Sequence, residues 1–225
     1  MKCQYQKRKE DEHMKALFVG DMYILFNADR LSINPYYGPM KMSHGFAGSI
    51  LMDLMLNERI QIIGNKLTVV NTTPIGDSFL DGALSLLVKS KPSKKIKYYI
   101  SYLLESGAYL YRLISDRLIK LDYMKMSITI KGFIPQITVD FFDKGIRENI
   151  VNTVKKILIN DSPVPDKHFW YFLSLLRATR SFKDILGKNH KKEVKTRLKK
   201  LVADEPIGKQ VKRAIREAET AETAP

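Results

Sequence analysis

Apolar residues recur at helical spacing through most of the chain. Between residues 43 and 57 they return every fourth position, at Phe46, Ile50 and Leu54. This pattern predicts a helix with a broad buried face, with Ser43 as its N-cap. Later segments predict further helices: one after an Asp77 N-cap, one or two in 96–118, one from about residue 143, a central apolar helix in 166–179, and two basic helices near the C-terminus.

Other apolar segments have the character of strands. The sequence MYILF at residues 22–26 is aromatic and branched, which predicts a buried strand. The segments IQII and KLTVV flank Gly64 and Asn65, which predicts a hairpin with a tight turn. A second hairpin is predicted in the apolar segment that ends at Pro135.

The two hairpins belong to a repeated arrangement. LMLNERIQIIGNKLTVVNTTP ends at Pro74, and YRLISDRLIKLDYMKMSITIKGFIP ends at Pro135. Each contains an apolar helix end, an arginine (Arg59 or Arg117), an apolar strand, a turn and a second strand. A helix followed by a β-wing is typical of winged-helix units. We therefore predict a mainly α, single-domain helical bundle with peripheral β-hairpins.

Length and composition agree with one folded domain. The chain has 225 residues, and its 44% hydrophobic content suffices for a substantial core. We predict a domain over residues 14–217 between disordered tails at 1–13 and 218–225. Neither a membrane span nor a signal-peptide core is evident, and Cys3 has no partner for an internal disulfide. These features predict a soluble, cytoplasmic protein whose membrane contact would be peripheral.

The charge balance favours an anionic partner. The 38 Lys and Arg residues exceed the 24 Asp and Glu residues, which gives a net charge of +14. Nucleic acid, an acidic protein and a membrane surface all remain open on this ground. Five lysines gather in one Pro-containing segment, which is either a solvated loop or a phosphate-contacting patch: Lys89, Lys91, Lys94, Lys95 and Lys97.

No catalytic pattern emerges from the residues. The single cysteine and four scattered histidines give no metal-ligand pair at useful spacing. Phosphate-binding loops and a GxSxG nucleophile elbow are absent from the sequence. Asp77 and Asp81 have the spacing of paired carboxylates, but helix capping by Asp77 is the simpler interpretation. We therefore predict a protein without metal or cofactor that is not an enzyme.

Two motifs resemble the Golgi phosphoprotein 3 family. They are GFAGSILMDLMLNERIQI and TPIGDSFLDGALSLL, in which Pro74, Gly76 and Asp77 keep the family's Pro-x-Gly-Asp spacing. Ile75 stands where the family usually has threonine. The order of predicted elements agrees with the family over residues 14–217. The resemblance implies a mainly α-helical, peripheral membrane protein that binds phosphatidylinositol 4-phosphate and holds the cytosolic tails of membrane proteins.

The resemblance also implies positions for a lipid headgroup. The family's tryptophan falls at Tyr37 or Gly38. Its first arginine falls at Ala47 and the later pair near Leu103 and Ser106, none of which is basic. Lys41 and Arg112 are nearby cations that would take their place, together with Tyr37. The lysine-rich surface would support binding to anionic lipid in general.

The second hairpin is unusually apolar and has three interpretations: core, contact between copies of the chain, or membrane-facing edge. The family resemblance favours self-association or membrane insertion. Its apolar residues include Met124, Met126, Ile128 and Phe133.

Two further functional hypotheses remain open. The protein would bind nucleic acid if the winged-helix-like units and basic C-terminal helices formed its interface. However, the exposed face of the predicted 43–57 helix carries almost none of the residues that a recognition helix needs. The second hypothesis is an interaction scaffold without a lipid partner.

Overall fold

The computed structural model describes residues 17–27, 40–90, 92–131, 134–140, 144–184 and 191–222. Its helices are α2 (Val19–Phe26), α4 (Met40–Leu56), α5 (Ser78–Lys89), α6 (Ile96–Glu105), α7 (Gly107–Lys120), α8 (Lys144–Ile159), α9 (Lys167–Thr179), α10 (Lys191–Leu201) and α11 (Pro206–Glu222), with a 3-10 turn at Ser181–Asp184. Its strands are β1 (Ile60–Ile63), β2 (Lys66–Val69), β3 (Lys94–Lys95), β4 (Lys125–Lys131) and β5 (Ile134–Asp140). The fold is mainly α with small hairpins, which confirms the predicted class.

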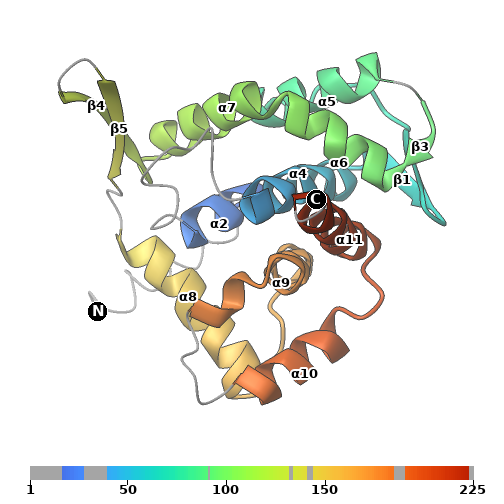
Figure 1. Cartoon of the computed structure of the whole chain (residues 1–225), viewed down its shortest axis with the longest axis vertical. Helices are drawn as coiled ribbons and strands as arrows, with labels where there is room; N and C mark the ends of the chain where they lie inside the picture. The colour runs from blue at the N-terminus through green and yellow to red at the C-terminus, as the bar shows by residue number, and fades with distance from the viewer. Residues whose placement is uncertain are drawn as a thin grey trace.

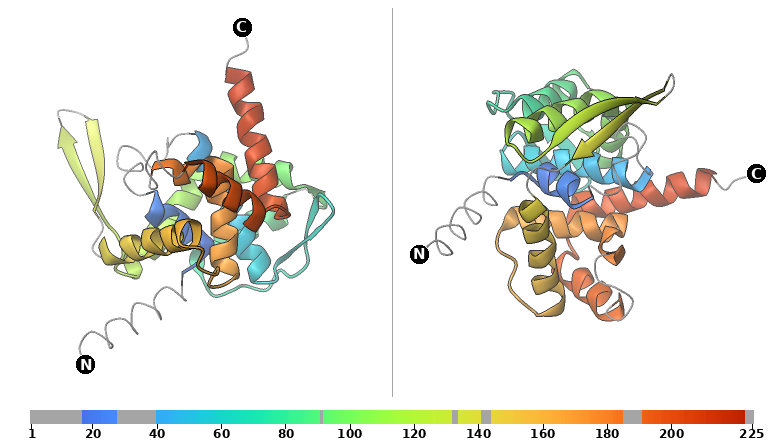
Figure 2. Two further views of the ribbon diagram at one scale, coloured as in Figure 1. Left: turned by 90° about the horizontal axis from the view of Figure 1, so that it is seen from below. Right: turned by 90° about the vertical axis from the view of Figure 1, so that its left-hand side faces the viewer.

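Helices α2 and α4 run through the middle of the molecule (Figure 1). Helices α5, α6 and α7 cover one side of this pair, and α8, α9 and α10 lie on the other side. The right-hand view of Figure 2 shows the same arrangement. Helix α11 packs against α4 and α9. The apolar face of α8 is buried as its periodicity predicted, at Ile146, Ile150, Val154, Ile157 and Leu158.

The strand prediction at residues 22–26 was wrong, because this segment is the second half of helix α2. All eight residues of α2 are buried, so no polar face marks the helical period in the sequence. Its N-terminal amides are satisfied from a distant segment: Val19 N and Gly20 N each donate to the Asp53 carboxylate of α4 at 2.8 Å. The sequence around α2 does not reveal this long-range cap.

Both predicted hairpins are present. Strands β1 and β2 pair from Ile60 opposite Val69 to Ile63 opposite Lys66, and Gly64 makes the turn with a φ of 62°. Strands β4 and β5 pair from Lys125 opposite Asp140 to Lys131 opposite Ile134. The repeated order of helix and hairpin is therefore real, as α4–β1–β2 and α7–β4–β5.

Other element boundaries differ from the sequence-based expectation. The lysine-rich segment is not wholly a loop, because β3 adds a third strand to β1 and β2. Helix α4 begins at Met40, so Ser43 lies inside it and is not its N-cap. Helix α11 continues to Glu222, past the predicted end of the folded region at residue 217. The predicted N-terminal tail lies outside the described residues.

Candidate functional site

The Pro-x-Gly-Asp motif forms the turn before α5. Gly76 adopts a φ of 90°, in the region that favours glycine. The Asp77 carboxylate accepts hydrogen bonds from Phe79 N at 3.0 Å and Leu80 N at 3.1 Å, which confirms the predicted N-cap. Asp81 accepts from Ile75 N at 2.6 Å and from Gly76 N at 3.1 Å. Both carboxylates therefore hold the turn that follows Pro74.

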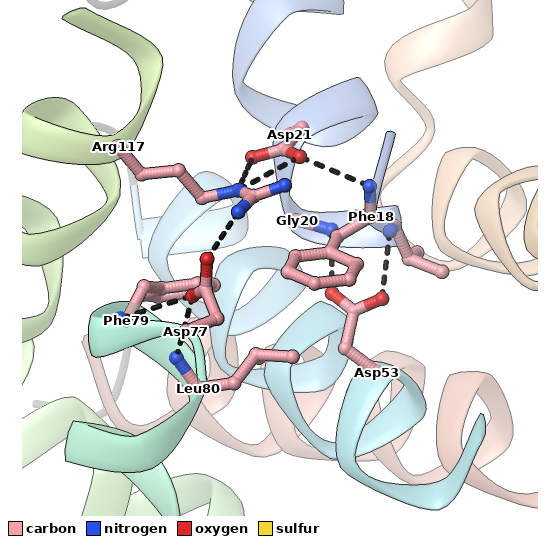
Figure 3. A network of polar contacts seen from close by, with 9 residues as sticks. Phe18, Gly20, Asp21, Asp53, Asp77, Phe79, Leu80 and Arg117 are labelled. Carbon is pink, nitrogen blue, oxygen red and sulfur yellow. Dashed lines mark hydrogen bonds and ion pairs between the residues drawn. The ribbon is translucent and has the colours of Figure 1, made fainter. Parts of the chain in front are cut away.

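Arg117 of α7 links this turn to the buried helix α2 (Figure 3). Its Nε lies 3.1 Å from both carboxylate oxygens of Asp21, and its Nη1 donates to Asp77. The guanidinium carbon also lies 4.0 Å from the ring centre of Phe18. Together with the Asp53 cap, these contacts connect α2, α4, α5 and α7.

Burial dominates the electrostatics of this network. The Asp21 side chain is fully buried, and desolvation raises its pKa from 3.8 to about 6 although Arg117 opposes the shift. Desolvation also raises the pKa of Asp53, against the hydrogen bonds from Gly20 N and Val19 N. The carboxylates bind the guanidinium and accept hydrogen bonds from backbone amides, so we interpret the network as structural.

The two arginines of the repeated arrangement have different partners. Arg59 donates from Nε to Thr73 O at 2.8 Å and from Nη1 to Asn57 O at 2.7 Å. These hydrogen bonds hold the segment that follows the first hairpin against the end of α4. Arg117 instead pairs with side chains from other elements, and no local pattern in the sequence indicates these partners.

The headgroup position implied by the family resemblance lies between α4, α6 and α7. Ala47, Leu103 and Tyr111 line a cavity of about 100 Å³ there. No lysine or arginine is among its described lining residues, and Glu105 contributes a carboxylate. The described lining of this cavity, with a carboxylate and without a lysine or arginine, does not favour a phosphorylated headgroup.

The structure does not bring the predicted headgroup residues together in that cavity. Lys41 Nζ lies 2.7 Å from Glu219 Oε1 of α11, and Arg112 is exposed on α7. Neither residue lines the cavity between α4, α6 and α7. Tyr37 lies outside the described residues.

The predicted lysine patch divides into three parts. Lys94 and Lys95 are exposed on β3, and Lys89 is exposed at the end of α5. Lys97 binds Glu217 of α11, so its charge is compensated. Lys91 lies outside the described residues.

For the second hairpin, core, contact between copies of the chain and membrane-facing edge all remain open. Met124, just before β4, is buried with 3% exposure, which places it in the core. The side chains of Met126 and Ile128 lie outside the described part of the structure, as does Phe133.

A basic cavity lies between α9, α10 and α11, and the sequence patterns did not predict it. Its volume is about 310 Å³, and its lining consists of six cations and two apolar residues: Arg177, Arg180, Lys195, Lys199, Lys212 and Arg216, with Phe182 and Leu198. The C-terminal lysines were visible in the sequence as basic helices. The two arginines at the end of the apolar helix α9 gave no such signal.

Comparison with models of protein families gives a match over most of the chain. The sequence model of the family Golgi phosphoprotein 3 (GPP34) matches residues 21–218, nearly the whole chain. None of the curated proteins matches. The matched region includes the Pro-x-Gly-Asp turn and all of the helices and strands from α4 to α10. The chain therefore belongs to the Golgi phosphoprotein 3 family.

Proposed function

We propose that this protein binds peripherally to anionic membranes and acts there as an adaptor for the cytosolic tails of membrane proteins. Its family suggests a lipid-binding or adaptor function and is not known for enzymatic activity. Within the part of the chain that the structure describes, every helix is too short or too polar to cross a membrane. Contact with a bilayer would therefore occur at its surface.

The observation that carries this proposal is a lysine edge on the sheet β1–β2–β3, made of Lys66, Lys94 and Lys95. Lys66 and Lys95 stand directly opposite each other on paired strands, an arrangement that is unfavourable for like charges. All three are exposed, and none forms an ion pair with a described residue. An anionic surface would relieve this repulsion.

An apolar side chain accompanies the lysine edge. Ile63 is 72% exposed, next to the hairpin turn and opposite Lys66. Lysines around an apolar tip suit the boundary between headgroups and acyl chains. Each lysine near such a surface contributes about 1 kcal/mol, so the three together support an affinity of about millimolar strength or weaker. Binding through this edge is therefore expected to depend strongly on salt.

The proposal does not rest on a phosphatidylinositol 4-phosphate pocket at the family position. The described lining around Ala47 supplies no guanidinium or ammonium group, and Lys41 is engaged by Glu219. We therefore propose that the lysine edge recognises negative surface charge and that this part of the molecule does not select one headgroup.

The nucleic-acid hypothesis receives less support. In the first helix–hairpin unit, α4 is buried along most of its length, so it presents no face to a groove. The basic helices α10 and α11 keep some of their charge exposed, but their best-defined feature is the concave cavity with α9.

The proposal can be tested by vesicle co-sedimentation of the full chain. The double variant Lys66→Gln/Lys95→Gln removes two charges from the lysine edge and is expected to lose most binding to phosphatidylserine vesicles. The matched control is Lys120→Gln/Lys167→Gln, which removes two exposed charges from α7 and α9. Equal binding by the two double variants would contradict a role for the lysine edge.

A further inference from the structure

The cavity between α9, α10 and α11 concentrates positive charge from three separate elements. Arg177 and Arg180 stand three residues apart at the end of α9, Lys195 and Lys199 four residues apart on α10, and Lys212 and Arg216 four residues apart on α11. The spacings on α10 and α11 each place two like charges on one helix face, where they repel, and Arg180 directly follows the last residue of α9. No described residue with a carboxylate lines the cavity.

The neighbouring carboxylates offset only part of this charge. Glu219 interacts electrostatically with Arg180 and Arg216, but its own carboxylate binds Lys41 and does not line the cavity. Glu217, the next acid on α11, binds Lys97 and Arg213. Arg177 donates to Val202 O at 3.1 Å, which uses one of its five N–H groups. None of the six cavity cations forms an ion pair with a described residue.

Titration behaviour agrees with this geometry. Desolvation and the charges of Arg216, Arg177, Arg180 and Lys195 lower the pKa of Lys212. The cations therefore act on one another across the three helices. An anion in the cavity would reverse this effect and favour the protonated amine.

Arg180 occupies a backbone conformation that is unfavourable for residues other than glycine. It ends α9 with φ of 61° and ψ of 20°, in the left-handed region where helices usually place glycine. Its side chain is exposed and lines the cavity. Backbone strain of this kind tends to persist where a side chain has a function.

We propose that this cavity binds a phosphomonoester group, carried by a soluble small molecule or by a lipid headgroup. The charge of such a group, between about −1.5 and −2 at pH 7, suits a cluster of six cations better than the single charge of a carboxylate or a phosphodiester does. Guanidinium groups also fork onto phosphate oxygens. The apolar floor of Phe182 and Leu198 and the volume of about 310 Å³ leave room for a small ring beside the phosphate.

This inference goes beyond the proposed function. The cavity residues are distinct from the lysine edge on β1–β2–β3, and a soluble phosphomonoester would fill the cavity without a membrane. Failure of either site therefore leaves the other testable.

The test uses isothermal titration of the full chain with inositol 1,4-bisphosphate, with unphosphorylated inositol as the chemical control. The variants are Arg180→Gly and Arg216→Gln, and the control Lys120→Gln removes one exposed charge from α7 outside the cavity. Loss of one charge-assisted hydrogen bond is expected to weaken binding about tenfold or more in both cavity variants. Lys120→Gln is expected to bind as the wild type does.

Thermal unfolding separates loss of the ligand site from loss of the fold. Arg180→Gly relieves both the left-handed strain and the charge repulsion, so its Tm without ligand is expected to rise. A variant that is more stable and binds less would support the proposal.

Vesicles distinguish the two sources of the phosphomonoester. Stronger binding to phosphatidylinositol 4-phosphate than to phosphatidylserine at matched charge, weakened by Arg180→Gly, would identify a lipid headgroup. Binding of the bisphosphate without this preference would identify a soluble ligand. Equal affinities of all four proteins for the bisphosphate would overturn the proposal, and so would binding of duplex DNA or single-stranded RNA while both phosphomonoester probes fail.

Discussion

Replacing Arg117 by methionine tests whether the buried charge network holds the helices together. The substitution preserves much of the side-chain bulk but removes the guanidinium from Asp21, whose side chain is fully buried. Removing one partner of a buried ion pair typically costs about 3–5 kcal/mol, because the other charge is left uncompensated. That is a large part of the roughly 5–15 kcal/mol of a typical domain. Loss of the Phe18 contact adds about 0.5–1 kcal/mol.

The loss of stability is expected to depend on pH. With Arg117 present, the pKa of Asp21 is about 6, and the guanidinium lowers it against the effect of burial. Without Arg117 this pKa rises further, and each tenfold gain in proton affinity costs about 1.4 kcal/mol at pH 8. At pH 5 the Asp21 carboxyl is largely protonated in both proteins. The destabilisation is therefore expected to be smaller at pH 5 than at pH 8.

Urea denaturation at the two pH values measures this difference. Arg112→Met is the control, since Arg112 is an exposed arginine on the same helix and its loss should change the free energy of unfolding by about 0.5 kcal/mol at most. Adding Asp21→Asn to Arg117→Met removes the uncompensated charge and is expected to restore part of the stability. A loss below about 1 kcal/mol at pH 8, an equal loss at both pH values, or no recovery in the double variant would refute this reasoning.

Two further predictions concern stability. The pKa of Asp21 is about 6 in the folded protein and 3.8 in the unfolded chain, so the native state binds more protons between these values. As pH rises from about 4 to 6, this residue therefore lowers the free energy of unfolding by up to about 3 kcal/mol. Urea melts across this range should show a flatter profile for Asp21→Asn, and identical profiles would contradict the assignment. Gly48→Ala should cost about 1–3 kcal/mol in thermal or urea unfolding, because its Cβ would lie 2.5 Å from the Val211 side chain and 2.9 Å from that of Leu175. Gly107→Ala, with nothing within 4 Å, should be neutral or stabilising; equal losses at both glycines would rule out helix crowding as the cause.

Local patterns in the sequence predicted much of the fold. The stripe of α8, the Asp77 cap and the Gly64 turn each depend on residues a few positions apart, and the structure confirms all three. The strand assigned to residues 22–26 failed because complete burial erases the polar face that marks a helix. No rule of local spacing would have corrected it.

The candidate sites depended on contacts between distant segments. Asp21, Asp77 and Arg117 meet although 96 positions separate the first from the last. The basic cavity likewise combines lysines that were evident on α10 and α11 with Arg177 and Arg180 at the end of an apolar helix. The net charge of the sequence predicted an anionic partner, but local sequence patterns could not show that these six cations lie together.

The most direct test of the proposed function is co-sedimentation with three sets of vesicles at near-physiological salt. One set contains phosphatidylinositol 4-phosphate, one contains phosphatidylserine at matched charge, and one contains neutral lipid only. The lysine edge predicts binding to both anionic sets, weaker at higher salt, and little binding to the neutral set. Absence of binding to both anionic sets would contradict the proposed membrane function, and binding to all three sets regardless of salt would contradict its electrostatic basis.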